Sequence, residues 1–240
     1  MELTIVIPAF NEEDNCIPLT EEVRAALEGV VEYEIVWVDD GSTDATVARL
    51  RQVAASMPGR VRIVRHPHSC GQSTALASGV AAARGTWIGT LDGDMQNDPA
   101  DLPNLLARRT APEPADMICG HRTRRKDTWL KRVSSRWANR IRAGLLHDHT
   151  PDTGCGLKVF RRDLFLALPY FDHMHRFLPA LALREGAVVV SVPVNHRPRE
   201  AGTSKYGFWD RAWVGLVDIF GVRWLIKRDR RPASRHEEEL

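Results

Sequence analysis

The sequence has few of the features that mark specialised protein classes. Its four cysteines lie far apart and form no C-x-x-C pair, so neither a zinc site of the usual spacing nor a small disulfide framework is expected. No uncharged stretch reaches the roughly 18 apolar residues of a membrane-spanning helix. The N-terminus also lacks the basic and apolar segments of a signal peptide. We therefore expect a reducing, cytoplasmic setting.

Charge of one sign is not in excess either. The 33 Lys and Arg residues against 31 Asp and Glu give a formal net charge of +2, which does not favour a nucleic-acid partner. The motifs G-x-G-x-x-G, G-x-x-x-x-G-K-[ST] and G-x-S-x-G are absent, which argues against a dehydrogenase, a P-loop nucleoside triphosphatase and an α/β-hydrolase. With 240 residues, 43% of them hydrophobic, the chain is long enough for one sizeable core.

Short apolar runs rich in Ile and Val alternate with segments of helical length. The runs are residues 3–7, 34–38, 61–64 and 86–91, and the helical segments are 20–27, 43–55 and 73–83. This alternation predicts an α/β fold with a mostly parallel central sheet flanked by helices. Such sheets bind ligands beyond the carboxyl ends of their strands. Acidic loops follow three of the runs, and we expect them to share that edge.

The loop after the fourth run is the best-defined candidate site. Alternate positions of an extended segment point the same way, which would bring the side chains of Asp92, Asp94 and Gln96 together. Hard cations such as Mg²⁺ or Mn²⁺ prefer oxygen ligands and share them with substrate phosphates, and Gly93 would let the backbone approach a diphosphate. An ordinary Asp-rich turn is the alternative. The place of this loop at the end of a buried strand favours a metal site over an ordinary turn.

Asp39 and Asp40 stand side by side at the end of the second run. Their mutual repulsion has a cost, which a ligand that donates hydrogen bonds would relieve. A base N–H or a ribose hydroxyl is such a donor. The same loop also has a simpler interpretation as a helix cap, with Ser42 or Thr43 as N-cap.

Two basic segments in the second half of the chain indicate further phosphate groups. Residues 122–136 include seven Arg and Lys, and Arg side chains bind phosphate oxygens bidentately. Beside a cation-bound diphosphate this segment would form a second phosphate site, although a solvated basic face is the alternative. Residues 197–205 also contain Arg and Lys side chains that suit phosphate oxygens, and Gly202 would let this segment close over a ligand as a lid.

The last predicted helix, Phe208 to about Ile226, carries Trp and Leu beside clustered Arg and Lys. This combination is typical of a helix that lies on an anionic membrane surface. Packing on its own domain, or contact with a second copy of the chain in a homo-oligomer, is the alternative. Three His-x-His pairs, at 66/68, 147/149 and 173/175, have no further ligand at metal-site spacing and are interpreted as loop histidines.

The order of the motifs is distinctive. Three early ones are IVIPAFNE at 5–12, VDDGSTD at 38–44 and DGDMQNDP at 92–99; later ones are GHR at 120–122, RVSSR at 132–136, DTGCGLKVFR at 152–161 and GTSKY at 202–206. In this order they resemble the family 2 inverting glycosyltransferases with the GT-A fold. The later motifs resemble its polyprenyl-phosphate branch, which includes dolichol-phosphate mannose synthase and bacterial undecaprenyl-phosphate sugar transferases.

This resemblance implies a role for each matching residue. The nucleoside would be held by Pro8, Phe10, Glu12 and Asp39, with Asp40 nearby. Mg²⁺ or Mn²⁺, and through it the diphosphate, would be held by Asp92, Asp94 and Gln96, with Gly93 between them. The lipid phosphate would be held by Arg122, Arg132 and Ser135. The residues closing over the donor would be Arg199, Ser204 and Lys205. We expect the catalytic residues to be Asp94, Arg122, Arg199, Lys205 and Asp152, of which Asp152 would orient the acceptor or the sugar.

The expected reaction is transfer of a sugar from a UDP- or GDP-linked donor to a polyprenyl phosphate, with inversion at the anomeric carbon. If the acceptor were a soluble saccharide, Asp152 would be the general base. A non-catalytic sugar-nucleotide-binding scaffold at a membrane is the third alternative. The expected organisation is a GT-A domain over 1–206, an amphipathic helix over 207–228 and a polar tail over 229–240. We expect the protein to be peripheral on the cytoplasmic face of a membrane.

Overall fold

The structure, a computed structural model of the chain, describes residues 1–122, 142, 144–146, 148, 150–198 and 208–228. Five of the predicted site residues lie outside the described residues: Arg132, Ser135, Arg199, Ser204 and Lys205. The polar tail lies outside them as well.

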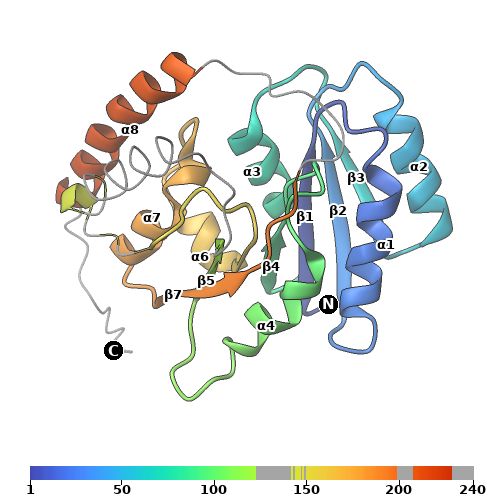
Figure 1. The fold of residues 1–240 in the computed structure, drawn as a ribbon, viewed down its shortest axis with the longest axis horizontal. Coiled ribbons are helices and arrows are strands. Elements are labelled where there is room, and N and C mark those ends of the chain that lie inside the picture. Colours follow the sequence, from blue (N-terminus) through green and yellow to red (C-terminus); the bar gives the residue numbers. More distant parts are fainter. Residues whose placement is uncertain (123–141, 143, 147, 149, 199–207, 229–240) are drawn as a thin grey trace, which may run out of the picture.

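Seven strands form one mixed sheet in the described part of the chain, in the order β3-β2-β1-β4-β6-β5-β7 (Figure 1). They are β1 (Leu3–Ala9), β2 (Tyr33–Asp39), β3 (Val61–Arg65), β4 (Trp87–Thr90), β5 (Met117–Arg122), β6 (Lys158–Arg161) and β7 (Val189–Val194). Only β6 runs antiparallel to its described neighbours, β4 and β5, whereas the other pairs are parallel. The predicted α/β fold with a mostly parallel sheet is confirmed.

Helices cover both faces of this sheet. They are α1 (Cys16–Leu27), α2 (Thr46–Ser56), α3 (Gln72–Ala82), α4 (Leu102–Ala107), α6 (Arg162–Ala167), α7 (Leu178–Arg184) and α8 (Phe208–Arg228), with short 3₁₀ turns η1 (Pro99–Asp101) and η2 (Met174–Arg176). One core cluster joins α1, α2 and α4 to one face, and a second joins α3, α6, α7 and α8 to the other. Figure 1 shows α1 and α3 on opposite sides of β1.

Alternating side chains explain why the first strand lies at the centre of both cores. Ile5 and Ile7 belong to the α1 side, and Val6 belongs to the α3 side. In β2 every residue is buried, as expected for a parallel strand covered on both faces. Trp37 of β2 is fully buried, and its indole N–H donates to Thr20 Oγ1 at 3.1 Å, so its polar group has a partner.

The start of α2 differs from the expectation. The helix begins at Thr46, and Ser42 and Thr43 do not cap it. Asp44 Oδ1 instead accepts the Thr46 N–H at 3.0 Å, which satisfies a free donor of the first turn. The predicted cap is therefore wrong, because Ser42 and Thr43 bond to the neighbouring loop.

Candidate active site

The carboxyl ends of the central strands open into one cavity of about 780 Å³. The residues that line it from the predicted site are Pro8, Phe10, Glu12, Asp40, Asp92, Gly93, Asp94, Gln96 and Arg122. Asp39 and Asp152, the other described candidates, do not line the cavity. Asp39 accepts from the Ser42 N–H, and Asp152 pairs with the lining residue Arg122. The predicted meeting of the acidic loops at one edge of the sheet is confirmed.

Hydrogen bonds join the loop after β1 to the loop after β2. The Asn11 N–H donates to Ser42 Oγ at 2.9 Å, and the Thr43 N–H donates back to Asn11 Oδ1 at 2.8 Å. One residue further on, the Glu12 N–H donates to Thr46 Oγ1 at 2.8 Å. Asn11 has a left-handed backbone, with φ of 57°, which Asn tolerates better than most residues. The two loops therefore form one wall, from which Phe10 and Glu12 face the cavity.

The acidic loop after β4 is a tight turn rather than the predicted extended segment. The Asp92 N–H donates to Asn97 Oδ1 at 2.8 Å, and the Gln96 N–H donates to Asp94 Oδ1 at 3.2 Å. Met95 reverses the chain between them in the left-handed region, with φ of 62°. The expectation of an extended segment was wrong because the side chains of Asn97 and Asp94 accept hydrogen bonds from the loop's own backbone. Asp92, Asp94 and Gln96 nevertheless all line the cavity.

The charge of Asp92 is poorly compensated by the described groups around it. Gln72 Nε2 donates to Asp92 Oδ1 at 2.9 Å, and a Cβ at Gly156 would collide with the carboxylate, so this glycine makes room for it. Burial and then repulsion by Asp94 raise the pKa of Asp92 to about 6, although Lys158 and Arg122 oppose the shift. Two carboxylates and an amide oxygen in such surroundings fit a hard divalent cation, whose charge would offset the repulsion.

The carboxylate of Asp40 accepts hydrogen bonds from four protein groups. Its Oδ1 accepts from His66 Nδ1 at 2.7 Å and the Cys70 N–H at 2.9 Å, and its Oδ2 accepts from Ser69 Oγ at 2.8 Å and the Gly71 N–H at 2.9 Å. Burial opposes ionisation, but these hydrogen bonds together hold the pKa of Asp40 below its ordinary value.

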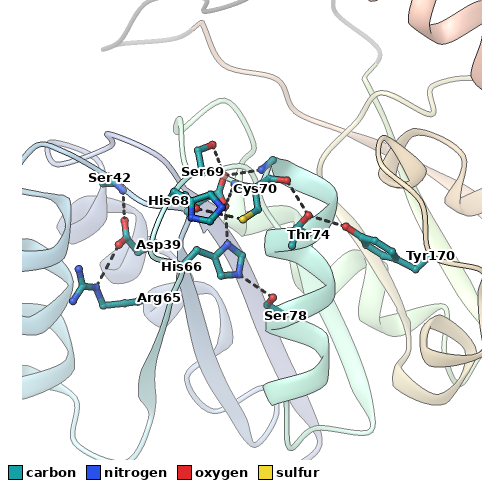
Figure 2. A network of polar contacts seen from close by, with 12 residues as sticks. Asp39, Ser42, Arg65, His66, His68, Ser69, Cys70, Thr74, Ser78 and Tyr170 are labelled. Carbon is teal, nitrogen blue, oxygen red and sulfur yellow. Dashed lines mark hydrogen bonds and ion pairs between the residues drawn. The ribbon is translucent and has the colours of Figure 1, made fainter.

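Asp39 is also satisfied by protein groups. Its side chain is fully buried and accepts from the Ser42 N–H at 3.1 Å and from Arg65 Nε at 3.5 Å (Figure 2). The idea that a ligand must relieve the repulsion between Asp39 and Asp40 is therefore wrong. Protein donors supply the relief, because the loop after β3 folds back over the end of β2.

Arg122 and Asp152 form a two-point ion pair on the far side of the acidic loop. Arg122 Nε donates to Asp152 Oδ2 at 2.6 Å, and Nη2 donates to Oδ1 at 2.8 Å. Burial alone would lower the pKa of Arg122, but the ion pair with Asp152 raises it above its ordinary value. Arg122 lines the cavity and Asp152 does not. Asp152 therefore positions the guanidinium, and a role as general base would require it to give up this pair.

Lys158 is a cavity residue that sequence reasoning missed. It is the first residue of β6 and 4% exposed, and its ammonium group donates to the carbonyl oxygens of Thr153 and Cys155. It thereby holds the turn that carries Gly156 against Asp92. A lysine at the start of a short apolar run was the available signal, since a buried ammonium needs several acceptors.

His175 is a second missed residue, and it comes from one of the His-x-His pairs. It belongs to η2 and lines the cavity, and its Nδ1 lies 2.7 Å from Ser73 Oγ of α3. Burial, and then the cationic Arg176 and Lys158, lower the pKa of His175 to about 3. The ring is therefore neutral near pH 7, and it offers the cavity a hydrogen-bonding group without charge.

The C-terminal helix α8 has two different faces. Ile219, Val222 and Leu225 pack against the second core cluster. On the other side Phe220 and Trp224 are each 58% exposed and Val217 is 56% exposed. Among the described helices, none is long and apolar enough to cross a bilayer. The outer side of α8 thus exposes three apolar side chains next to a basic helix end.

Known proteins match this chain along most of its length. A profile of the family described as "Glycosyl transferase family 2" matches residues 4–168. The dodecaprenyl-phosphate galacturonate synthase of Rhizobium johnstonii is 36% identical over 97% of this chain and 70% of its own length. The undecaprenyl-phosphate 4-deoxy-4-formamido-L-arabinose transferase of Enterobacter sp. is 34% identical over 86% of this chain. This chain covers 63% of that transferase's length.

Solved structures support the same fold. Glucosyl-3-phosphoglycerate synthase from Mycobacterium tuberculosis, in complex with Mn²⁺, UDP and glucosyl-3-phosphoglycerate, has a TM-score of 0.69 at 20% identity and covers 94% of this chain and 79% of its own. The same enzyme with Mg²⁺ and UDP has a TM-score of 0.70 at 19% identity, with the same coverage of both chains. Together with the family profile and the relatives, these matches confirm the resemblance read from the motifs: the chain belongs to glycosyl transferase family 2.

Proposed function

We propose that this protein transfers a sugar from a nucleotide sugar to a polyprenyl phosphate, with inversion at the anomeric carbon. The observation that carries the proposal is the position of Asp92, Asp94 and Arg122 in one cavity. Carboxylates suit a cation-bound diphosphate, and an oriented guanidinium suits a second phosphate. The printed activities of both relatives are sugar transfers to polyprenyl phosphates, which supports the same class of acceptor here.

The donor occupies the β1–β4 half of the cavity in this proposal. Pro8, Phe10 and Glu12 hold the nucleoside, with Asp39 and Asp40 shaping the wall behind it. Asp92, Asp94 and Gln96 hold Mg²⁺ or Mn²⁺, an assignment supported by their oxygen donors and by the high pKa of Asp92. When bound, the cation neutralises charge on the departing diphosphate. Two solved structures with a similar fold contain Mn²⁺ or Mg²⁺ together with UDP.

The acceptor approaches from the β5–β6 half. Arg122, oriented by Asp152, binds the lipid phosphate, and we assign Arg132 and Ser135 to the same group. A phosphate oxygen, which is already anionic near neutral pH, attacks the anomeric carbon, so no strong general base is required. Arg199, Ser204 and Lys205 close over the donor and stabilise the leaving group. The ion pair of Asp152 disfavours the rival reaction, in which this carboxylate activates a saccharide hydroxyl.

We further propose that α8 rests on the cytoplasmic face of a membrane, which brings a lipid acceptor to the cavity. The exposed Val217, Phe220 and Trp224, with Lys227 and Arg228 at the helix end, support this placement. The organisation is then a catalytic domain over 1–206 and a membrane-contacting helix over 207–228, followed by a polar tail. The alternative occupant of this face is a second copy of the chain.

The test is transfer of labelled sugar to undecaprenyl phosphate in detergent, with a panel of UDP- and GDP-sugars and Mg²⁺ or Mn²⁺. We expect lipid-linked product from one donor class, and a loss of about 10²-fold or more in Arg122→Met. Arg108→Met is the matched control, because Arg108 is exposed at the end of α4. Product on a soluble saccharide but not on the lipid phosphate would overturn the acceptor assignment. Nucleotide-sugar binding without any product would favour the scaffold alternative.

A further inference from the structure

Three different metal-ligand types converge beneath the loop after β3. Asp40, His66 and Cys70 each offer one ligand atom, and these three atoms all lie within 4.8 Å of one another. Figure 2 shows His66, Ser69, Cys70 and Ser78 in this network. Asp40 comes from the end of β2, 26 residues before His66, so ligand spacing along the sequence gave no sign of the cluster. The function proposed above makes no use of His66 or Cys70.

The ring of His66 is fixed from both sides. Nδ1 lies 2.7 Å from Asp40 Oδ1, and Nε2 lies 2.9 Å from Ser78 Oγ on α3. Because Asp40 is an ionised acceptor, Nδ1 carries the proton and Nε2 accepts from the serine hydroxyl. A hydrogen-bond partner on the second nitrogen is the usual support of a metal-binding histidine, because it orients the ring and selects the tautomer.

The two carboxylate oxygens of Asp40 accept hydrogen bonds from different groups. Oδ2 holds the loop through Ser69 Oγ and the Gly71 N–H. Oδ1 faces the His66 ring and the Cys70 backbone. A cation at Oδ1 would therefore leave the two contacts of Oδ2 in place. The Cys70 side chain is a free thiol at the exposed end of the cluster, which gives a cation a path from solvent.

We propose that Asp40, His66 and Cys70 form a binding site for a divalent cation of borderline softness, of which Zn²⁺ is the representative. One carboxylate oxygen, one imidazole nitrogen and one thiolate are ligands that Zn²⁺ accepts, with water in the fourth position. On binding, the Cys70 thiol releases its proton to solvent. The His66 proton moves from Nδ1 to Nε2, and the Nε2–H then donates a hydrogen bond to Ser78 Oγ; nothing is oxidised or reduced. The site differs from the oxygen-only set of Asp92, Asp94 and Gln96, which suits Mg²⁺ or Mn²⁺.

Occupation of this site has a consequence for the cavity, which rests on the function proposed above. Asp40, Ser69 and Gly71 all line the donor half of the cavity. A cation that draws Oδ1 away from the Cys70 N–H shifts this wall. Zn²⁺ therefore acts as an inhibitor that weakens nucleotide-sugar binding, and the catalytic Mg²⁺ or Mn²⁺ does not relieve the inhibition by competing for the same ligands.

The test is titration of the full chain with Zn²⁺, and with Co²⁺ as a spectroscopic probe, in the presence of excess Mg²⁺ and without substrates. We expect one site per chain with a thiolate-to-Co²⁺ charge-transfer band. In Cys70→Ser the band disappears and the Zn²⁺ affinity falls by at least about tenfold. In His66→Gln the affinity falls similarly, with thermal unfolding as the check that this variant folds. His68→Ala is the matched control, because His68 is an exposed neighbour outside the ligand set.

Equal Zn²⁺ affinity in wild type and Cys70→Ser, or loss of binding in His68→Ala, would overturn the site. Because these measurements contain no substrate, they stand apart from any failure of the proposed transferase activity. A second readout is the Zn²⁺ concentration that halves sugar transfer. We expect it to rise by at least about tenfold in Cys70→Ser, while activity without Zn²⁺ stays at the wild-type value; an unchanged concentration would overturn the inhibitory role.

Discussion

The two halves of the cavity are held together in different ways. On the donor side, loops that follow neighbouring strands are joined by hydrogen bonds from backbone N–H groups to short polar side chains, as between Asn11 and Thr43. On the acceptor side, the cavity wall depends on charged groups, the Arg122–Asp152 pair and the ammonium of Lys158. On the donor side several hydrogen bonds join the same two loops, so the loss of one leaves the others in place. A buried ion pair, by contrast, is lost when either partner is removed. The acceptor half should therefore be the more sensitive to single substitutions.

The largest effect is expected at the acceptor-side ion pair. Asp152→Asn removes one charge of a pair whose side chains are 13% and 8% exposed, which leaves Arg122 buried without its ion-pair partner. We expect a loss of about 3–5 kcal/mol in the free energy of unfolding, measured by urea denaturation. The double variant Asp152→Asn/Arg122→Met should regain part of that loss. If the single variant unfolds like wild type, the contrast between the halves is wrong.

The next effect concerns the acidic turn between the halves. Asp94→Asn keeps the shape of the side chain and removes one of the two carboxylates proposed to hold the cation. We expect the turnover number to fall by about 10²–10³-fold, with unfolding by urea nearly unchanged. The measurement is the initial transfer rate at several Mn²⁺ concentrations. Asp14→Asn is the control, because Asp14 is exposed between β1 and α1 and does not line the cavity; an equal loss in both variants would contradict a specific role for Asp94.

A smaller effect follows from the neutral His175, which lines the same cavity. The pKa of His175 is about 3 in the folded chain, whereas a histidine in the unfolded chain has a pKa of about 6.5. Between these pH values the unfolded chain therefore binds a proton at this residue and the folded chain does not. Folding stability contributed by this group is therefore lost as the pH falls from about 6.5 towards 3. Between pH 7 and 5 the loss should be about 1–2 kcal/mol. Urea denaturation of His175→Asn at both pH values should show a flatter dependence than wild type, and a parallel dependence would refute the assignment.

An effect no larger than that of His175 is expected on the donor side. Asn11→Ala removes the acceptor of the Thr43 N–H and places Ala at a left-handed position, with φ of 57°. We expect a loss of about 1–2 kcal/mol in unfolding free energy and a modest rise in KM for the nucleotide sugar. Asn11→Gly adopts this backbone conformation without strain but also lacks the side-chain acceptor. It should therefore regain the part of the loss that is due to backbone strain and not the part that is due to the missing hydrogen bond. A loss as large as that of Asp152→Asn would remove the difference between the halves.

Local pattern was sufficient to predict what lies at the edge of the sheet. The apolar runs ended where acidic loops began, and parallel strands bring those ends together, so Asp92, Asp94 and Glu12 were placed in one cavity without knowledge of strand order. Motif order gave the family. These predictions succeeded because each depends on residues close together in the chain, or on a rule that holds for any parallel sheet.

Only the tertiary structure decided which charged groups pair. Arg122 meets Asp152 across 30 positions of sequence, because β6 inserts antiparallel between β4 and β5 and its preceding turn falls beside the end of β5. Asp40 meets His66 and Cys70 because the loop after β3 folds back over β2. The residue type shows that a buried charged or polar group needs a partner, and the order of the strands determines which residue that partner is.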